Sequence, residues 1–242
     1  AVPAPMANAP VKAVTPATFA SVAASAKPGD ILQLGAGTYP AFYWTRSGTA
    51  AAPIVIRSSA GAVINGNIDL FSQSHVHFTG LTVNGRIRFN NSSGIAITRC
   101  NIKTSGDGIV VYLRSENSYI ADNVITGATV WASSSLGVNG NNVGEGVLVT
   151  GPGHVIMNNR IAGFRDAISL LEQSEAVDQF SIDILNNDLR VAADDAVEAD
   201  YCFHNCRVMR NRVTDAFMGM SSQPSLGGPT YFIRNTMYNV VY

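Results

Sequence analysis

Short runs of alternating apolar and polar residues recur along the chain, and many of them contain an asparagine followed two residues later by a large aliphatic residue. Alternation with a period of two is typical of β-strands. Successive asparagines are 36, 28, 24 and 24 residues apart, which indicates one strand-based unit repeated with insertions. The five pairs are Asn123 with Ile125, Asn159 with Ile161, Asn187 with Leu189, Asn211 with Val213, and Asn235 with Met237.

A second column of residues opens another strand in each repeat. Its members are Asp107-Gly-Ile, Glu145-Gly-Val, Asp166-Ala-Ile and Asp195-Ala-Val, with Met218-Gly-Met at the matching place. Two or three strands in about 24 residues can stack as the coils of a solenoid, in which each coil buries its inward side chains against its neighbours. The sequence therefore predicts an all-β, single-stranded parallel β-helix. A stacked column of buried amides satisfies turn backbone groups, so we interpret the asparagines as structural and place Cys100 in the same column one coil earlier.

The domain organisation follows from this pattern. Residues 1–13 are expected to be extended, residues 14–30 to form a short capping helix, and residues 31–242 to form the coils. Phe19, Val22 and Ala26 are spaced for one helical face, and Lys27-Pro28-Gly29-Asp30 ends the helical pattern. Solenoids cover their ends with such caps, but the last residues carry none. We therefore expect the C-terminal end to be uncapped and the coils to continue beyond residue 242, in a missing part of the same polypeptide.

Composition narrows the class of protein. With 242 residues, 46% of them hydrophobic, the chain can form one sizeable core. A net charge of −1 gives no electrostatic footprint for nucleic acid, and no stretch approaches the length of a membrane span. The small, proline-rich start is typical of residues that remain after a signal peptide is removed, which predicts a secreted or periplasmic protein. Cys202 and Cys206 could form a small-loop disulfide, or join His204 in a metal site.

The first coils carry a specific resemblance. The segments Pro28-Gly29-Asp30-Ile31 to Gly37-Thr38-Tyr39, Gly48-Thr49 with Ala52-Pro53-Ile54-Val55-Ile56, and Val63-Ile64-Asn65-Gly66 are similar to the start of right-handed parallel β-helix proteins of the pectate-lyase-like superfamily. Within it the pattern most resembles the chondroitinase-B and alginate-lyase type. The resemblance implies a right-handed helix and cleavage of an acidic polysaccharide by β-elimination. The same fold also serves hydrolases, epimerases and non-catalytic proteins.

Carboxylates crowd into residues 194–200, where Asp194, Asp195, Glu198 and Asp200 lie within seven residues. Alignment with the other coils turns alternate residues inward, so Glu198 and Asp200 are expected to point outward as an exposed pair about 6.6 to 6.8 Å apart. Their neighbours one coil away would be Ser169 and Leu171 on one side, and Ser221 and Gln223 on the other. The prediction is a polar shelf along which a linear sugar polymer can lie. The expected inward residues are Ile109, Val111, Val147, Val149, Ile168, Leu170, Val197 and Ala199.

Three interpretations of these acids stay open. In a lyase, the pair with Asp166, Asp194 or Asp195 could hold Ca²⁺. Alternatively, arginines such as Arg165 and Arg207 could neutralise the uronate carboxylate, and in either case Tyr201, His204 or Lys103 would then remove the C5 proton. In a hydrolase, Glu198 and Asp200 would be acid and base, at a spacing that favours inversion. In a structural role, acids at coil starts cap turns.

Four residues outside the acidic segment complete the predicted substrate site. Ser169, Ser221 and Gln223 line the shelf, and Trp131, in the loop Thr129 to Asn142, could supply an aromatic platform for a sugar ring or pack onto its own coil. We predict a carbohydrate-active protein that cleaves an acidic, uronate-containing polysaccharide by β-elimination. The alternatives are a glycoside hydrolase and a non-catalytic solenoid that binds glycans or has a structural role.

Overall fold

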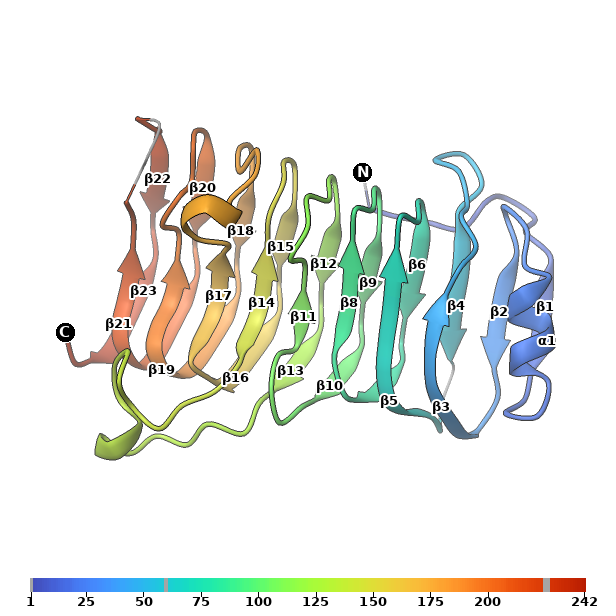
Figure 1. Ribbon diagram of the computed structural model, residues 1–242, viewed down its shortest axis with the longest axis horizontal. Helices are drawn as coiled ribbons and strands as arrows, with labels where there is room; N and C mark the ends of the chain where they lie inside the picture. Colours follow the sequence, from blue (N-terminus) through green and yellow to red (C-terminus); the bar gives the residue numbers. More distant parts are fainter. Residues whose placement is uncertain (1, 59–60, 224–226) are drawn as a thin grey trace.

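The computed structural model describes residues 2–58, 61–223 and 227–242. These residues wind into a stack of coils that begins beside a short helix and continues to β22 and β23 (Figure 1). The strand pairs along the stack are parallel, from β1 with β2 to β21 with β23. The all-β parallel β-helix predicted from the repeats is confirmed.

One wall of the β-helix, here called the first wall, is a ten-stranded sheet. Its strands follow one another in space in the order in which they occur in the sequence, one from each coil. They are β1 (Val11–Val14), β2 (Ile31–Leu34), β4 (Ile54–Ser58), β6 (Val76–Thr79), β9 (Ala96–Thr98), β12 (Tyr119–Ala121), β15 (Val155–Met157), β18 (Asp183–Leu185), β20 (Cys206–Met209) and β22 (Thr230–Ile233).

A second sheet bends to form the other two walls. The longest strands of this sheet, β5 (Ala62–Phe71), β19 (Asp188–Glu198) and β21 (Arg212–Ser221), cross the bend. The first half of β19 pairs with β16 on the second wall and its second half with β17 on the third wall. The remaining strands of this sheet are β3 (Gly37–Trp44), β7 (Thr82–Asn84), β8 (Ile87–Asn90), β10 (Asn101–Lys103), β11 (Ile109–Val110), β13 (Val124–Thr126), β14 (Glu145–Val149), β16 (Arg160–Phe164), β17 (Asp166–Leu170) and β23 (Thr236–Val240).

The N-terminal cap is smaller than predicted. The helix α1 spans Phe19–Ala24, not residues 14–30. Residues 11–14 instead form β1, which pairs with β2 and adds a strand to the first wall. The Phe19 ring contacts the rings of Tyr39 and Phe42, with centroids 5.7 and 4.8 Å apart. The short helix therefore covers the first coil mainly through one aromatic side chain.

The asparagine column forms a continuous hydrogen-bonded ladder. In each step the side-chain Nδ2 and the backbone N–H of one asparagine both donate to Oδ1 of the next, from Asn123 through Asn159, Asn187 and Asn211 to Asn235. Nδ2 of Asn159 also donates to the carbonyl of Ile120, at 3.0 Å. The Cys100 N–H donates to Asn123 Oδ1 at 2.9 Å, which confirms that Cys100 belongs to the column. Buried polar groups at these turns are thus satisfied by the neighbouring coils.

The inward faces of the third wall also agree with the sequence pattern. Side chains predicted to point inward are almost fully buried in the common core: Ile109, Val111, Val147, Val149, Ile168, Leu170, Val197 and Ala199. The described helices are all too short to cross a membrane.

Candidate functional site

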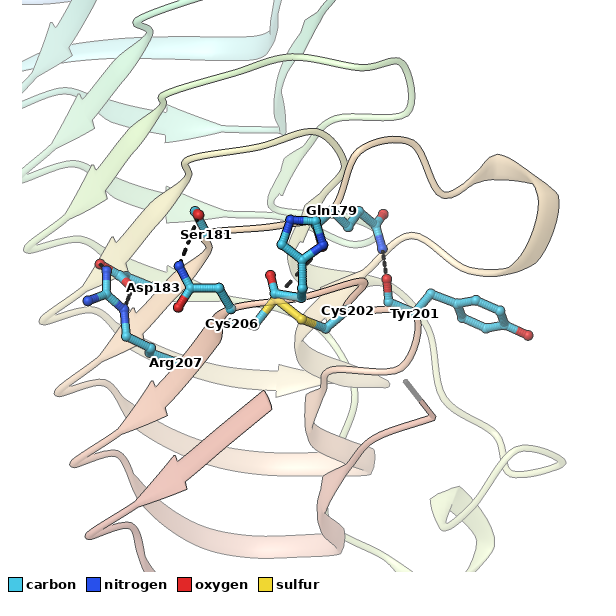
Figure 2. Close-up of a disulfide and its surroundings, with 9 residues drawn as sticks. Gln179, Ser181, Asp183, Tyr201, Cys202, Cys206 and Arg207 are labelled. Carbon is cyan, nitrogen blue, oxygen red and sulfur yellow. Dashed lines mark hydrogen bonds and ion pairs between the residues drawn. A yellow bond between two sulfur atoms is a disulfide. The ribbon is translucent and has the colours of Figure 1, made fainter. Parts of the chain in front are cut away.

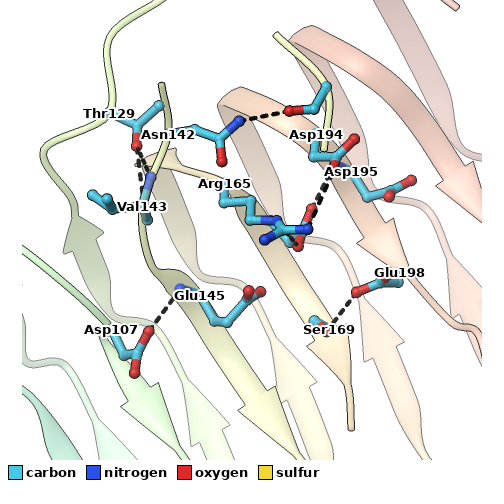
Figure 3. Close-up of polar contacts among 12 residues, drawn as sticks. Asp107, Thr129, Asn142, Val143, Glu145, Arg165, Ser169, Asp194, Asp195 and Glu198 are labelled. Atoms are coloured by element: carbon cyan, nitrogen blue, oxygen red, sulfur yellow. Dashed lines mark hydrogen bonds and ion pairs between the residues drawn. The ribbon is translucent and has the colours of Figure 1, made fainter. Parts of the chain in front are cut away.

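An acidic cleft of about 220 Å³ lies on the third wall, over β14, β17 and β19. Polar residues from three successive coils line it, together with the short 3-10 helix η2 (Gln173–Glu175) that follows β17. Figure 3 shows some of these side chains, among them Glu145, Arg165, Ser169 and Glu198. The polar lining residues are Glu145, Arg165, Asp166, Ser169, Glu172, Glu175 and Glu198.

Some of the carboxylates at the coil starts cap the next coil. Asp107 Oδ1 accepts the backbone N–H of Glu145 at 3.0 Å, and Asp166 Oδ1 accepts the backbone N–H of Asp195 at 2.7 Å. These bonds satisfy turn amides that the sheet leaves without a partner. The interpretation of these acids as turn caps is therefore supported for Asp107 and for one oxygen of Asp166.

Three carboxylate oxygens in and around the cleft are buried without a hydrogen-bond partner among the described residues. They are Glu145 Oε2, Asp195 Oδ1 and Asp200 Oδ1, and Asp195 and Asp200 are only 7% and 4% exposed. A buried oxygen with no donor carries a desolvation cost that a proton or a cation can offset. Two groups bring their carboxylate oxygens within 4.8 Å of one another: Asp166 with Asp194 and Asp195, and Glu172 with Glu198 and Asp200.

Arg165 is the one cation among the described residues that line the cleft. Its guanidinium lies 3.7 Å from both Asp166 and Asp194, which is ion-pair contact without a close hydrogen bond. Its backbone N–H donates to the carbonyls of Val143 and Gly144. The loop 127–144 holds Val143 through two hydrogen bonds with the Thr129 hydroxyl, at 3.0 and 3.1 Å (Figure 3). This loop therefore positions the backbone of Arg165 at the edge of the cleft.

Burial and crowding of like charges raise the pKa of the acids in the cleft. Burial, together with the charges of Asp166 and Asp194, raises the pKa of Asp195 to about 7. Burial and the nearby Glu172 carboxyl, which shares a hydrogen bond, raise the pKa of Glu198. Burial and the charge of Asp166 likewise raise the pKa of Glu145. Without a cation, these acids therefore hold their protons more tightly than ordinary carboxyl groups. A bound cation would favour their ionised forms.

The expected exposed pair of Glu198 and Asp200 is corrected by the structure. Glu198 ends β19 and is half-buried, and it accepts a hydrogen bond from the Ser169 hydroxyl at 2.9 Å. Asp200 is buried, because the strand ends before it and the chain turns, with the Cys202 N–H donating to the Ala199 carbonyl. Gln223 Nε2 donates to Asp200 Oδ2 at 2.6 Å. The predicted register of Ser169 and Ser221 on either side of Glu198 is confirmed.

Several predicted site residues lie away from the cleft. His204 is exposed and stacks on Phe180, with ring centroids 4.7 Å apart, beside the first wall. Arg207 belongs to β20 of that wall and forms a two-point ion pair with Asp183. Lys103 lies on β10, several coils earlier. The structure thus does not bring these three residues to the acidic cleft.

Two further predicted residues, Tyr201 and Trp131, belong to segments near the cleft but are not among the residues that line it. Tyr201 directly follows Asp200 and is half-buried, and its carbonyl accepts a hydrogen bond from Gln179 Nε2 at 2.9 Å. Trp131 is half-buried in the loop 127–144, which extends across the coil edge as far as β19, where the Gly137 N–H donates to the Ala193 carbonyl. Figure 1 shows this loop running below the coils to β21.

Cys202, two residues after Asp200, forms a disulfide with Cys206 (Figure 2). It closes the turn that leads from the third wall back to the first wall. Both cysteines are buried, and His204 between them points to Phe180, so the alternative Cys-His-Cys metal site does not form.

Glu172 and Glu175 are cleft residues that the sequence pattern did not reveal. Both follow β17: Glu172 directly precedes η2 and Glu175 ends it, outside the alternating strand pattern. Glu145 was noted only as a coil-start acid. Their position could have indicated that they join the cleft, because both are acids in a short insertion directly after a strand of the same wall.

Comparison with known proteins supports the fold. Searches found no matching family model and no matching curated protein. Among solved structures, the chain resembles pectate lyase Pel9A, with a TM-score of 0.61 and 12% identity over 94% of this chain and 76% of that chain. It also resembles an alginate lyase from Paenibacillus sp. str. FPU-7, with a TM-score of 0.61 and 19% identity over 95% and 96% of the two chains.

A third similar structure is the PL6 family alginate lyase AlyGC, with a TM-score of 0.55 and 14% identity. The match covers 95% of this chain but 35% of that one. At these identities the likeness establishes a shared architecture. The protein has the right-handed parallel β-helix fold, as the resemblance of its first coils implied.

Proposed function

We propose that the protein cleaves an acidic, uronate-containing polysaccharide by β-elimination in the acidic cleft. The observation that carries the proposal is the set of buried carboxylate oxygens that have no hydrogen-bond partner among the described residues, near the guanidinium of Arg165. Such a site can take a cation and, through it and the arginine, the carboxylate of a uronate. The fold shared with pectate and alginate lyases supports this substrate class.

The residues fit a divalent cation of the Ca²⁺ type. Ca²⁺ takes several oxygen ligands, mainly carboxylates, and Asp166, Asp194 and Asp195 offer oxygens within 4.8 Å of one another. The partnerless Oδ1 of Asp195 is among the oxygens available for it. A bound Ca²⁺ would neutralise a uronate carboxylate and so make its C5 proton more acidic.

The protein's own groups would carry the remaining steps. Arg165 would bind and orient the uronate carboxylate by charge-assisted hydrogen bonds. A base, for which Tyr201 is the candidate, would take the C5 proton. A double bond would form between C4 and C5 as the C4–O bond breaks. Glu198, whose raised pKa keeps a proton at neutral pH, would donate that proton to the leaving oxygen. Tyr201 is the proposed base, since it is the base candidate next to the acidic cluster.

The disulfide between Cys202 and Cys206 supports an oxidising location. Such bonds persist outside the cytosol, and a polysaccharide substrate would be met there. We therefore propose that the protein is secreted or periplasmic.

The test is an ultraviolet assay for unsaturated uronate with alginate, pectate, chondroitin sulfate and glucuronan, in Ca²⁺ and in chelator. We expect product from one of these polymers, dependent on Ca²⁺ and lost in Glu198→Gln. Asp183→Asn is the matched control, because Asp183 is also ion-paired but lies on the first wall. Reducing ends without unsaturated product would instead identify the hydrolase, and binding without either product would identify a glycan-binding module.

A further inference from the structure

Three arginines surround one aspartate on the outside of the second wall. Arg190 donates to both oxygens of Asp188 at 3.1 Å, and Arg212 donates to the same two oxygens at 3.4 and 2.8 Å. Arg160 Nε lies 3.8 Å from Asp188 Oδ2. We call Arg160, Arg190 and Arg212, with Asp188, the arginine patch.

The patch carries an excess of positive charge. One carboxylate can neutralise one of the three guanidiniums, and the arginine side chains are 68%, 49% and 60% exposed. Partial burial alone would raise the pKa of Asp188, but hydrogen bonds from Arg212 and Arg190 lower it, so Asp188 stays ionised. The Arg160 guanidinium makes no hydrogen bond to the described residues, although it lies 3.8 Å from Asp188 Oδ2. By contrast, Arg207 and Asp183 on the first wall form a one-to-one ion pair with no excess charge.

The arrangement of the patch follows the axis of the solenoid. Arg160, Asp188 and Arg212 occupy equivalent positions on β16, β19 and β21, which are three successive coils. Neighbouring parallel strands lie about 4.7 to 4.9 Å apart, so the charges form a short column along the stack. A linear polymer that lies along the axis would meet these groups one after another.

The acidic cleft does not attract an anionic polymer by its own charge, so a positive column nearby could hold the polymer instead. The cleft on the third wall is lined by acids, with Arg165 as the one cation among the described lining residues, so those acids that are ionised repel a polyanion. Strand β19 carries both features, with Asp188 and Arg190 in its first half and Asp194 to Glu198 in its second half. An exposed positive surface beside a negative site can hold and steer an anionic partner.

We propose that the arginine patch binds the carboxylate or sulfate groups of a linear acidic polysaccharide, as a second contact outside the cleft. The identity of the polymer rests on the proposed function, whereas the charge and position of the patch do not. Arginine forks suit such groups because they donate two parallel hydrogen bonds to planar anions. The patch needs no metal ion.

The test measures binding separately from cleavage. Binding of the intact protein to alginate and to polygalacturonate is measured in chelator, where we expect no turnover. The variant Arg160→Gln/Arg212→Gln is compared with the control Arg207→Gln, which removes one exposed, ion-paired arginine from the first wall. At low salt we expect the double variant to bind about tenfold more weakly than the parent protein, and the control to bind equally well. Binding by the double variant should also depend less on salt than binding by the parent. The charge-conserving variant Arg160→Lys/Arg212→Lys should recover most of the affinity.

The outcomes separate this inference from the proposed function. Arginine-dependent binding in a protein that releases no unsaturated product would support the patch and count against the lyase. Cleavage with full binding in the double glutamine variant would overturn the patch and leave the lyase intact. Equal binding of fully methyl-esterified pectin, which carries no charge, would also overturn the patch.

Discussion

Asp166 Oδ1 accepts the backbone N–H of Asp195 at 2.7 Å, while Asp195 Oδ1 is itself buried without a partner among the described residues. The acids at the coil starts are therefore not equivalent. Asp107 and Asp166 each cap the next coil, but the residue opposite Asp195 on β21 is Met218 and no such cap forms. The last acid of the column is free to serve a ligand.

The first prediction concerns Asp195→Asn. The amide removes one negative charge from a group of three, so the metal-free variant should be at least as stable as the parent protein. It should also lose most of the stabilisation by Ca²⁺, because a bound ion stabilises the folded state by mass action. Thermal unfolding in chelator and in excess Ca²⁺ measures both effects. A full Ca²⁺-dependent rise in Tm in the variant would contradict the assignment, and Asp183→Asn should behave like the parent.

The second prediction is a loss of stability as the pH rises in chelator. The pKa of Asp195 is raised from 3.8 to about 7 in the folded state. A raised pKa means that the folded state holds a proton more tightly than the unfolded state, so this stabilisation is full below about pH 4 and is lost as the pH rises through about 7. We expect Tm to fall by several degrees between pH 5 and pH 8. Ca²⁺ should reduce the fall, and Asp195→Asn should flatten it. A Tm that is independent of pH over this range in chelator would refute the prediction.

The third prediction concerns the asparagine ladder. Asn187→Ala removes the acceptor for two donors of Asn159 and the Nδ2 donor to the Ile156 carbonyl. Because these groups are buried, the free energy of unfolding should fall by about 2 to 4 kcal/mol. Urea unfolding measures the change. Asn101→Ala, an exposed position on β10, should change it by less than about 0.5 kcal/mol. A similar small change for Asn187→Ala would show that the ladder adds little.

Repetition explains which features could be predicted. Asn159 and Asn187 were recognisable because their spacing repeats, and Ile168 and Val197 because alternation fixes the buried side of a strand. Asp200 was misplaced because β19 ends at Glu198, and alternation has no meaning beyond the end of a strand.

The residues of the cleft could not be predicted in this way, because their positions depend on turns and insertions that do not repeat. Arg207 follows Glu198 by nine residues in the sequence, but the disulfide-closed turn carries it to another wall. Glu172 lies in an insertion, and insertions carry no register. The fold was therefore readable from local periodicity, whereas the group of acids required knowledge of where two turns place their side chains.

The break in the ladder at Cys100 allows a final prediction. Cys100 occupies a ladder position, and its Sγ lies 3.8 Å from the Phe78 carbonyl. Asn123 donates from Nδ2 to the corresponding carbonyl of Ile97 at 2.9 Å. In Cys100→Asn, the new amide can donate both to Phe78 and to Asn123 Oδ1, so the ladder should extend by one coil.

An added buried hydrogen bond contributes about 1 kcal/mol, and we expect Tm to rise by about 2 to 4 °C. Cys100→Ala is the matched control: it also removes the thiol but provides no amide, and it should lower Tm. Comparison of the two variants isolates the amide from the loss of sulfur. If Cys100→Asn were less stable than Cys100→Ala, the site would be too tightly packed for an amide, and the cysteine would mark a true end of the ladder.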